Sequence, residues 1–187
     1  MNISIFELTH QGCVKSACLA GMGHHVIAHD HSPEKVARIN RGDSIIAETG
    51  VPELVRAAHE KGLLEATCDC RTAVHGSDIS FIMVRTPRNR DGNLNLNNVH
   101  AIAKQIGEAL KDKDEFHIIA ICSTVPPGTA RKVSEILAAG QFADKAELAK
   151  MGNAATLRLY RENAAEAFLV NGEGRRTGTL STADAQI

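Results

Sequence analysis

The chain has 187 residues and a formal net charge of −1, from 21 Lys and Arg against 22 Asp and Glu, so we expect neither nucleic acid nor an anionic membrane as a partner. Its hydrophobic content of 43% supports a buried core, yet no run approaches the roughly 18 apolar residues of a membrane span, and the first residues lack the features of a signal peptide. Five cysteines at irregular spacing predict reduced thiols and a cytoplasmic location rather than a disulfide framework.

Strands and helices are predicted to alternate along the chain as far as about residue 139. The expected strands are residues 2–6, 25–28, 66–70, 79–84 and 117–122. The expected helices are one between the first two strands and then residues 33–40, 51–61, 72–75, 99–110 and 128–137. This order is typical of the α/β class. It predicts a Rossmann-like, doubly wound parallel sheet in the order 3-2-1-4-5, with helices on both faces.

The sequence pattern also predicts two parts, a domain and a tail. Residues 1–139 form the Rossmann-like, dinucleotide-binding type of domain, and residues 140–187 form a divergent, partly helical tail. Within the tail we expect helices over 144–150 and 154–168, followed by a polar, Gly- and Thr-rich end.

The turn after the first strand is where a dinucleotide-binding βαβ unit carries G-x-G-x-x-G. Here the register puts Glu7, Thr9 and Gly12 at the three glycine positions, so only the third glycine is present. In such a unit the first glycine permits the turn, the second lets the backbone approach the pyrophosphate, and the third serves helix–strand packing. A carboxylate at Glu7 would also repel a phosphate charge about 4 Å away by roughly 4 kcal/mol at an effective dielectric of 20. Only the glycine that serves packing is kept, and the two that serve the turn and the ligand are replaced. The sequence therefore favours a structural role for this turn over ligand binding.

Further motifs follow in order along the chain. They are Ala47-Glu48-Thr49-Gly50, Val84-Arg85-Thr86-Pro87, Asp91-Gly92-Asn93-Leu94-Asn95-Leu96 and Ser123-Thr124-Val125-Pro126-Pro127-Gly128-Thr129. With the first strand, they resemble the N-terminal NAD-binding domain of the UDP-glucose/GDP-mannose 6-dehydrogenase family over roughly the first 138 residues. Residues 91–96 are more similar to the GDP-mannose branch than to the UDP-glucose branch.

The resemblance implies an NAD-dependent, two-step oxidation of a sugar C6 alcohol to a carboxylate, with a nucleotide sugar or a full-length homologue as partner. It also assigns roles to single residues. Gly12 matches the last fingerprint glycine, Asp30 matches the acid that binds the adenosine ribose, and Lys35 matches a basic residue near that ribose. Thr86 and Pro87 match the loop beside the dinucleotide. Thr124 matches a threonine that lies close to the nicotinamide and the catalytic water.

Departures from the family pattern limit what the chain is expected to do. Arg85 replaces the glycine of V-G-T-P, and the family's central dimerising helix, catalytic lysine and asparagine, and nucleophilic cysteine have no counterpart in these residues. We therefore expect the chain alone not to run the complete reaction. The alternative is a non-catalytic, cofactor-free remnant or interaction module.

Each candidate residue also has an ordinary structural interpretation. Asp30 is either a ribose-binding acid or a loop carboxylate, and Thr124 is either catalytic or a strand-end or capping residue. Arg85 is either a solvated side chain or a phosphate-binding fork.

Histidines and cysteines gather near the second and third strands, at His24, His25, His29, His31, Cys68 and Cys70. The C-x-C spacing of the two cysteines is tighter than the C-x₂₋₄-C pairs of structural zinc sites. Cysteine is also a common core residue. We therefore predict no metal site.

Overall fold

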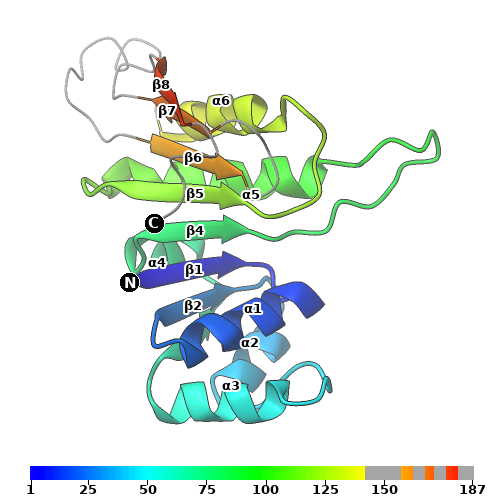
Figure 1. Cartoon of the computed structure of the whole chain (residues 1–187), viewed down its shortest axis with the longest axis vertical. Helices are drawn as coiled ribbons and strands as arrows, with labels where there is room; N and C mark the ends of the chain where they lie inside the picture. Colours follow the sequence, from blue (N-terminus) through cyan, green and yellow to red (C-terminus); the bar gives the residue numbers. More distant parts are fainter. Residues whose placement is uncertain (142–156, 162–166, 171–175, 181–187) are drawn as a thin grey trace. The chain divides into compact units, whose positions relative to one another are not determined.

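The structure is a computed structural model that describes residues 1–141, 157–161, 167–170 and 176–180. The chain divides into two compact units, Met1–Val84 and Arg85–Ile187. In both units strands and helices alternate up to residue 141, as the sequence predicts (Figure 1).

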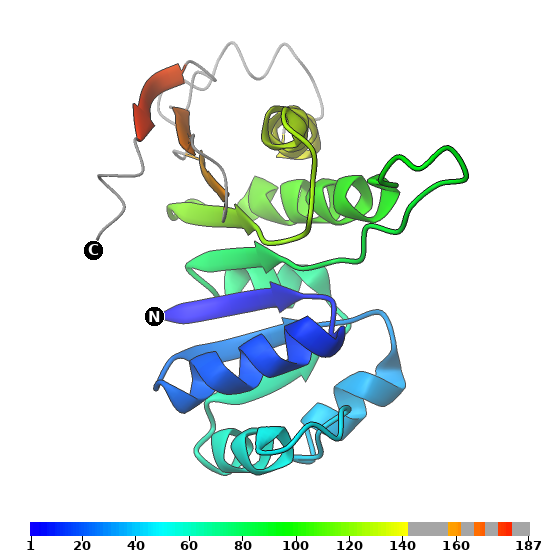
Figure 2. The same cartoon turned by 45° about the vertical axis from the view of Figure 1, so that its right-hand side comes forward.

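The first unit holds four parallel strands in the order β3-β2-β1-β4. The strands are β1 (Asn2–Phe6), β2 (His25–His29), β3 (Leu64–Thr67) and β4 (Ile79–Ile82). The helices are α1 (His10–Gly21), α2 (Pro33–Ile39), α3 (Val51–Glu60) and α4 (Cys70–His75). Helix α1 lies on one face of the sheet and α4 on the other (Figure 1, Figure 2). The predicted doubly wound α/β class is thus confirmed.

Strand β1 is central in this sheet, where it is hydrogen-bonded to β2 along one edge and to β4 along the other. The strand is buried from Ile3 to Phe6, and its one polar residue in that stretch, Ser4, is hydrogen-bonded to the Ser80 hydroxyl at 2.7 Å. Phe6 pairs with His29 on one side and with Ile82 on the other. The turn that follows β1 therefore lies beside the carboxyl end of β2.

The third strand differs from its expected range of 66–70. It begins at Leu64 and ends at Thr67, because the Asp69 carboxylate accepts hydrogen bonds from the Arg71 and Thr72 N–H groups and starts α4. A capping residue thus ends the strand earlier than the apolar pattern suggested.

The second unit contains α5 (Asn97–Ala109), a 3₁₀ turn at Leu110–Asp112, β5 (His117–Ile121) and α6 (Thr129–Gln141). The two helices pack closely, since a Cβ on Gly107 of α5 would lie 2.7 Å from the carbonyl oxygen of Leu137. None of the helices in the described ranges is long and apolar enough to cross a membrane.

The predicted helix over 154–168 is wrong. The chain forms β6 (Leu157–Arg161) and β7 (Ala167–Val170) there, followed by β8 (Arg176–Leu180). Strand β6 pairs in parallel with β5, and β7 and β8 continue antiparallel. Pairing with an existing strand overrides a weak helical preference in such short apolar segments. The other expected tail helix, 144–150, lies outside the described residues.

The polar segment 88–97 forms a narrow arm, which Figure 2 shows projecting from the second unit. Its two sides meet through a bridge between Arg88 and Leu94, and the Asn89 N–H donates to the Asn93 carbonyl at 2.7 Å. Turn hydrogen bonds therefore order this polar, Gly- and Asn-rich stretch.

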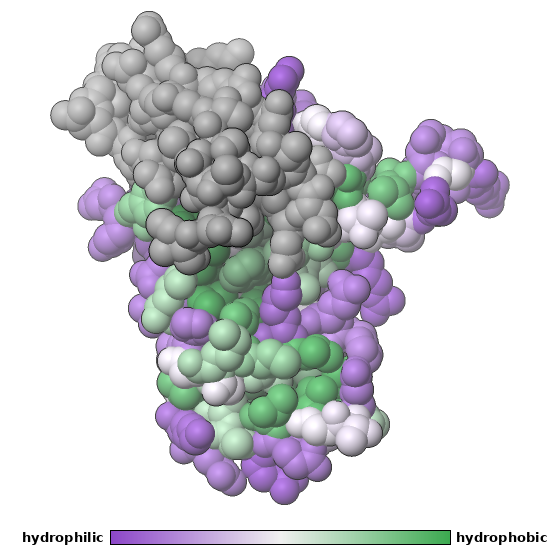
Figure 3. Space-filling model, viewed as in Figure 1, coloured by the Kyte–Doolittle hydropathy of each residue, from purple (hydrophilic) through white to green (hydrophobic). Residues whose placement is uncertain are grey.

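Apolar side chains reach the surface on the face of the first unit seen in Figure 3. Met22, which caps α1, is 73% exposed, and Leu54 of α3 is 39% exposed. Single exposed apolar residues are ordinary on a protein surface, so we assign no role to this face.

Gly12 sets how closely α1 approaches the turn after β1. A Cβ built on Gly12 would lie 2.1 Å from the carbonyl oxygen of Glu7, a distance that no side chain tolerates. Glycine is therefore required here by packing between the helix and the turn. This is the structural role that the last fingerprint glycine has in dinucleotide-binding units.

We expect Gly12→Ala to destabilise the protein by about 1–3 kcal/mol, since the turn or the helix must move to admit the methyl group. Gly21→Ala is the matched control in the same helix, because a Cβ there meets only the Leu54 Cδ2 at 3.6 Å. It should be neutral or stabilise by up to about 1 kcal/mol. Urea unfolding followed by circular dichroism gives both values. Equal stability of the two variants would contradict the packing role of Gly12.

Candidate functional site

The β1–α1 turn keeps the backbone shape of a glycine turn without the first glycine. Glu7 has φ +80°, and among the described residues it is the non-glycine position with positive φ. Its N–H donates to the His29 carbonyl oxygen at 2.8 Å, which holds the turn against β2. The left-handed conformation costs a residue with a Cβ about 1–2 kcal/mol. The fold therefore imposes on Glu7 the conformation that glycine adopts without strain.

Thr9 occupies the position of the second glycine but has an ordinary extended backbone, with φ −71° and ψ 179°. It is the N-cap of α1, and its Oγ1 accepts a hydrogen bond from the Gly12 N–H at 3.1 Å. Free N–H groups at a helix N-terminus are the donors that bind a phosphate in dinucleotide-binding units. The Thr9 hydroxyl thus occupies one donor that a phosphate would otherwise take. Threonine is a preferred N-cap, so this role was open to prediction from the sequence.

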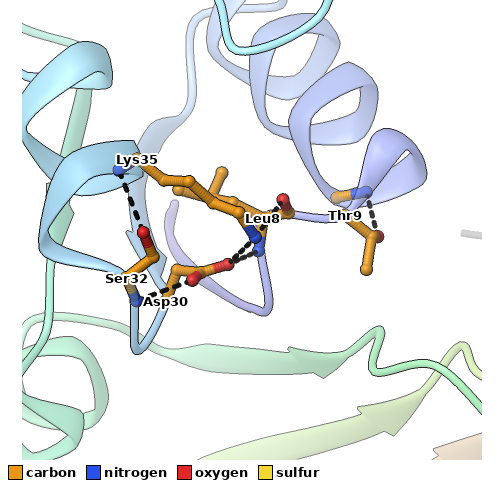
Figure 4. A network of polar contacts seen from close by, with 6 residues as sticks. Leu8, Thr9, Asp30, Ser32 and Lys35 are labelled. Atoms are coloured by element: carbon orange, nitrogen blue, oxygen red, sulfur yellow. Dashed lines mark hydrogen bonds and ion pairs between the residues drawn. The ribbon is translucent and has the colours of Figure 1, made fainter.

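Asp30 joins the end of β2 to the β1–α1 turn (Figure 4). Its Oδ2 accepts from the Leu8 N–H at 2.9 Å and from Lys35 Nζ at 2.8 Å, and its Oδ1 accepts from the Ser32 N–H at 2.9 Å. Lys35 Nζ also donates to the Leu8 carbonyl oxygen at 3.1 Å. These contacts bring two of the predicted site residues, Asp30 and Lys35, into one network with the turn.

The network keeps Asp30 charged although the residue is only 5% exposed. Burial alone would raise the pKa of this carboxyl group. The hydrogen bond from Lys35 and the N–H groups of Ser32 and Leu8 outweigh burial, so the pKa of Asp30 is lowered. A charged, immobilised carboxylate at the end of the second strand has the chemistry to accept hydrogen bonds from ribose hydroxyls.

A second contact reaches the start of α1 from the segment before α3. His10 Nε2 lies 2.7 Å from the Glu48 carboxylate, and both side chains are more than half exposed. Sequence spacing gave no signal for this pair, because the two residues are far apart along the chain. A surface pair of this kind contributes about 0–1 kcal/mol.

The remaining predicted site residues lie in the second unit. The Thr86 hydroxyl donates to the carbonyl oxygen of Thr124 at 3.0 Å, so these two residues are adjacent. The carbonyl oxygen of Pro87 accepts from the Asn95 N–H at 2.7 Å, at the base of the arm. Thr124 is exposed, and the Arg85 carbonyl is held by the Asn98 side chain at 3.0 Å.

The cysteines and histidines do not assemble a metal centre in the described part of the chain. No group of three or more potential ligands comes together there. None of the five cysteines, all of which lie in the described residues, forms a disulfide, and Cys13 is buried in the core.

Comparison with known proteins agrees with this geometry. Residues 1–156 match the model of the UDP-glucose/GDP-mannose dehydrogenase family, NAD binding domain, so the match runs past the point near residue 138 where the sequence motifs end. GDP-mannose 6-dehydrogenase of Pseudomonas aeruginosa is 41% identical over 133 residues, which are 71% of this chain and 30% of the relative. The Azotobacter vinelandii enzyme of the same name is 37% identical over 165 residues, which are 88% of this chain and 38% of the relative.

A solved structure shows the same fold. The ternary complex of GDP-mannose dehydrogenase from Pseudomonas aeruginosa superposes with a TM-score of 0.77 at 36% identity, covering 87% of this chain and 36% of that one. The chain thus spans about a third of the length of the relatives that it matches.

We expect Asp30→Asn to destabilise the protein at pH 7 by about 1–3 kcal/mol, because the charge-assisted hydrogen bonds weaken. Since the pKa of Asp30 is lowered in the folded state, its stabilisation is present above the unfolded value of about 3.9 and is lost as the pH falls through the folded value. Urea unfolding at pH 7 and near pH 3 should therefore show the difference from wild type shrinking at the lower pH. Asp43→Asn is the control, because Asp43 is half exposed and contacts Arg41 at 3.3 Å. A difference for Asp30→Asn that persists unchanged in acid would contradict this account.

Proposed function

Because the chain belongs to the UDP-glucose/GDP-mannose dehydrogenase family, we propose that it acts as the NAD-binding domain of a nucleotide-sugar 6-dehydrogenase and that its affinity for the dinucleotide is low. The observation that carries this proposal is the β1–α1 turn, which keeps the left-handed backbone at Glu7 and the close approach at Gly12. Family membership and five cysteines at irregular spacing support a reducing, cytoplasmic location.

The residues fit the ribose end of a dinucleotide better than its pyrophosphate. Asp30 is charged and held in place, with Lys35 beside it. Ribose hydroxyls would take over some of the hydrogen bonds that the Asp30 carboxylate now accepts. The residues fit the pyrophosphate less well. The Gly12 N–H already donates to the Thr9 hydroxyl, and the Glu7 side chain is a carboxylate. By resemblance to the family motifs, we assign Thr86 and Pro87 to the loop beside the dinucleotide and Thr124 to the nicotinamide end.

When bound, NAD would supply the hydride acceptor for oxidation of a sugar alcohol. This chain's own contribution is to orient the dinucleotide through Asp30 and the start of α1. We further propose a nucleotide sugar, or a full-length homologue that supplies the remaining groups, as the partner. GDP-mannose is the first substrate to test, since both relatives described above are named GDP-mannose 6-dehydrogenase.

The second candidate function is a cofactor-free interaction module. The Thr9 cap and the Glu7 carboxylate favour it, because both oppose a phosphate at the start of α1. Dinucleotide titration separates the two candidates, since a ligand at 100 times its Kd adds about 2.7 kcal/mol of stability.

We expect NAD to bind the wild-type chain more weakly than at ordinary micromolar affinity, and Glu7→Gly with Thr9→Gly to tighten binding at least tenfold. The double change removes the carboxylate and frees the Gly12 N–H for phosphate. Thermal-shift and calorimetric titrations with NAD⁺ and NADH measure both values.

Two further variants separate the causes. Glu7→Gln removes the charge without relaxing the backbone, and Asp30→Asn in the double variant should abolish the gain. Ordinary micromolar binding by the wild type would refute the account of the turn. Absence of binding in every variant would favour the interaction module.

We expect the 187-residue polypeptide alone not to oxidise GDP-mannose or UDP-glucose. The second oxidation needs a thiolate nucleophile, and holding the substrate in a reactive geometry contributes about 7–11 kcal/mol in well-oriented systems. No cysteine here lies in the sequence context of the family nucleophile. NADH formation at 340 nm is the assay, with Thr124→Ala as control. Turnover that the control abolishes would overturn this expectation.

A further inference from the structure

His29, the last residue of β2, is a buried histidine whose ring has only a weak main-chain contact, at Cys68. It is 1% exposed, and neither ring nitrogen makes a hydrogen bond of good geometry among the described residues. Its ring packs on Phe6 with centroids 5.0 Å apart and meets the His31 ring edge-on at 5.1 Å. A buried polar group left unpaired costs about 1–3 kcal/mol, so this residue is an unusual choice for the interior of a sheet.

The surroundings of His29 disfavour a positive charge on its ring. Burial lowers the pKa of His29 most, and the neighbouring His31 lowers it further. The main chain at Cys68 and the carboxylates of Asp30 and Asp69 oppose these effects only in part. Asp30 is already paired with Lys35, and Asp69 is engaged by the start of α4, so neither carboxylate is available to solvate the ring.

The main chain of the same residue holds the β1–α1 turn. The His29 carbonyl oxygen accepts the Glu7 N–H at 2.8 Å, and the next residue, Asp30, accepts the Leu8 N–H at 2.9 Å. The turn is itself strained, because Glu7 is held at φ +80°. Movement of the His29 ring out of its packing against Phe6 would disturb the carbonyl that keeps Glu7 in this conformation.

We propose that His29 is a proton sensor for the β1–α1 turn: protonation of its ring in mildly acidic solution expels the ring from the core and releases the turn from the end of β2. The device goes beyond the proposed function, because it acts on the chain whether or not a dinucleotide binds. It needs only the buried ring, the lack of a hydrogen bond of good geometry to that ring within the described residues, and the two main-chain contacts to the turn.

The first test is the pH dependence of unfolding between pH 7.5 and pH 5, a range in which ordinary carboxylates do not titrate. A group whose folded pKa is lowered binds its proton more readily in the unfolded state, so stability is full above about pH 6.5 and falls below it. Relative to His29→Leu, the unfolding equilibrium constant of the wild type should rise by up to tenfold for each pH unit below about 6.5. His29→Val is a second replacement in case leucine does not fit the strand.

Two controls isolate the ring. His24→Gln, just before the opposite end of β2, should keep the wild-type pH dependence. His31→Gln removes a neighbour that lowers the pKa of folded His29, so the loss of stability should still begin at about pH 6.5 but should be smaller and level off at a higher pH than in the wild type. If the slope persists in both His29 replacements, or if the ring titrates at or above pH 6.5 in a histidine NMR experiment on the wild type, the proposal is overturned.

The second test concerns the turn itself. Hydrogen exchange should show the Glu7 and Leu8 amides losing protection in acid before the other amides of β1, and only when His29 is present. A pH-dependent stability without this local loss would refute the link to the turn.

Discussion

The close approach of Gly12 to the Glu7 carbonyl governs the geometry of the first unit. Because no Cβ can stand between them, α1 starts directly above the end of β1 and its N-terminus points over the carboxyl edge of the sheet. Phe6 and His29 then pair at that same edge, which brings Asp30 within reach of the Leu8 N–H. This close approach and the pairing of β1 with β2 together bring the turn and Asp30 into contact.

The hydrogen-bonding groups of this site are already engaged with one another. The Asp30 carboxylate binds the Leu8 N–H and Lys35, and the Thr9 hydroxyl binds the Gly12 N–H. A dinucleotide has to exchange these contacts for its own, so its net gain is smaller than in a turn whose donors are free. This exchange is the physical reason for the low dinucleotide affinity that we propose.

Much of this arrangement was predictable from the sequence. Strand β1, helix α2 with its Ser32 cap, and the position of Asp30 follow from apolar runs and end signals that act locally. The left-handed backbone at Glu7 was not predictable, because the fold imposes it against the residue's own preference. Strand β6 was missed for a related reason: its conformation depends on pairing with β5, which lies far away in the sequence. The contact between His10 and Glu48 likewise depends on a loop that returns to α1.

At Glu7 the usual trade-off between ligand binding and stability does not hold. Functional sites commonly carry strain that lowers stability, so that improving one property harms the other. At this position the strained residue is also the one that opposes a phosphate, and relief of about 1–2 kcal/mol exceeds the entropy of roughly 0.5–1 kcal/mol that a glycine loses on folding. Selection of this chain for heat resistance alone would thus favour Glu7→Gly and remove the carboxylate that opposes a phosphate, but it would keep the Thr9 cap, which stabilises α1.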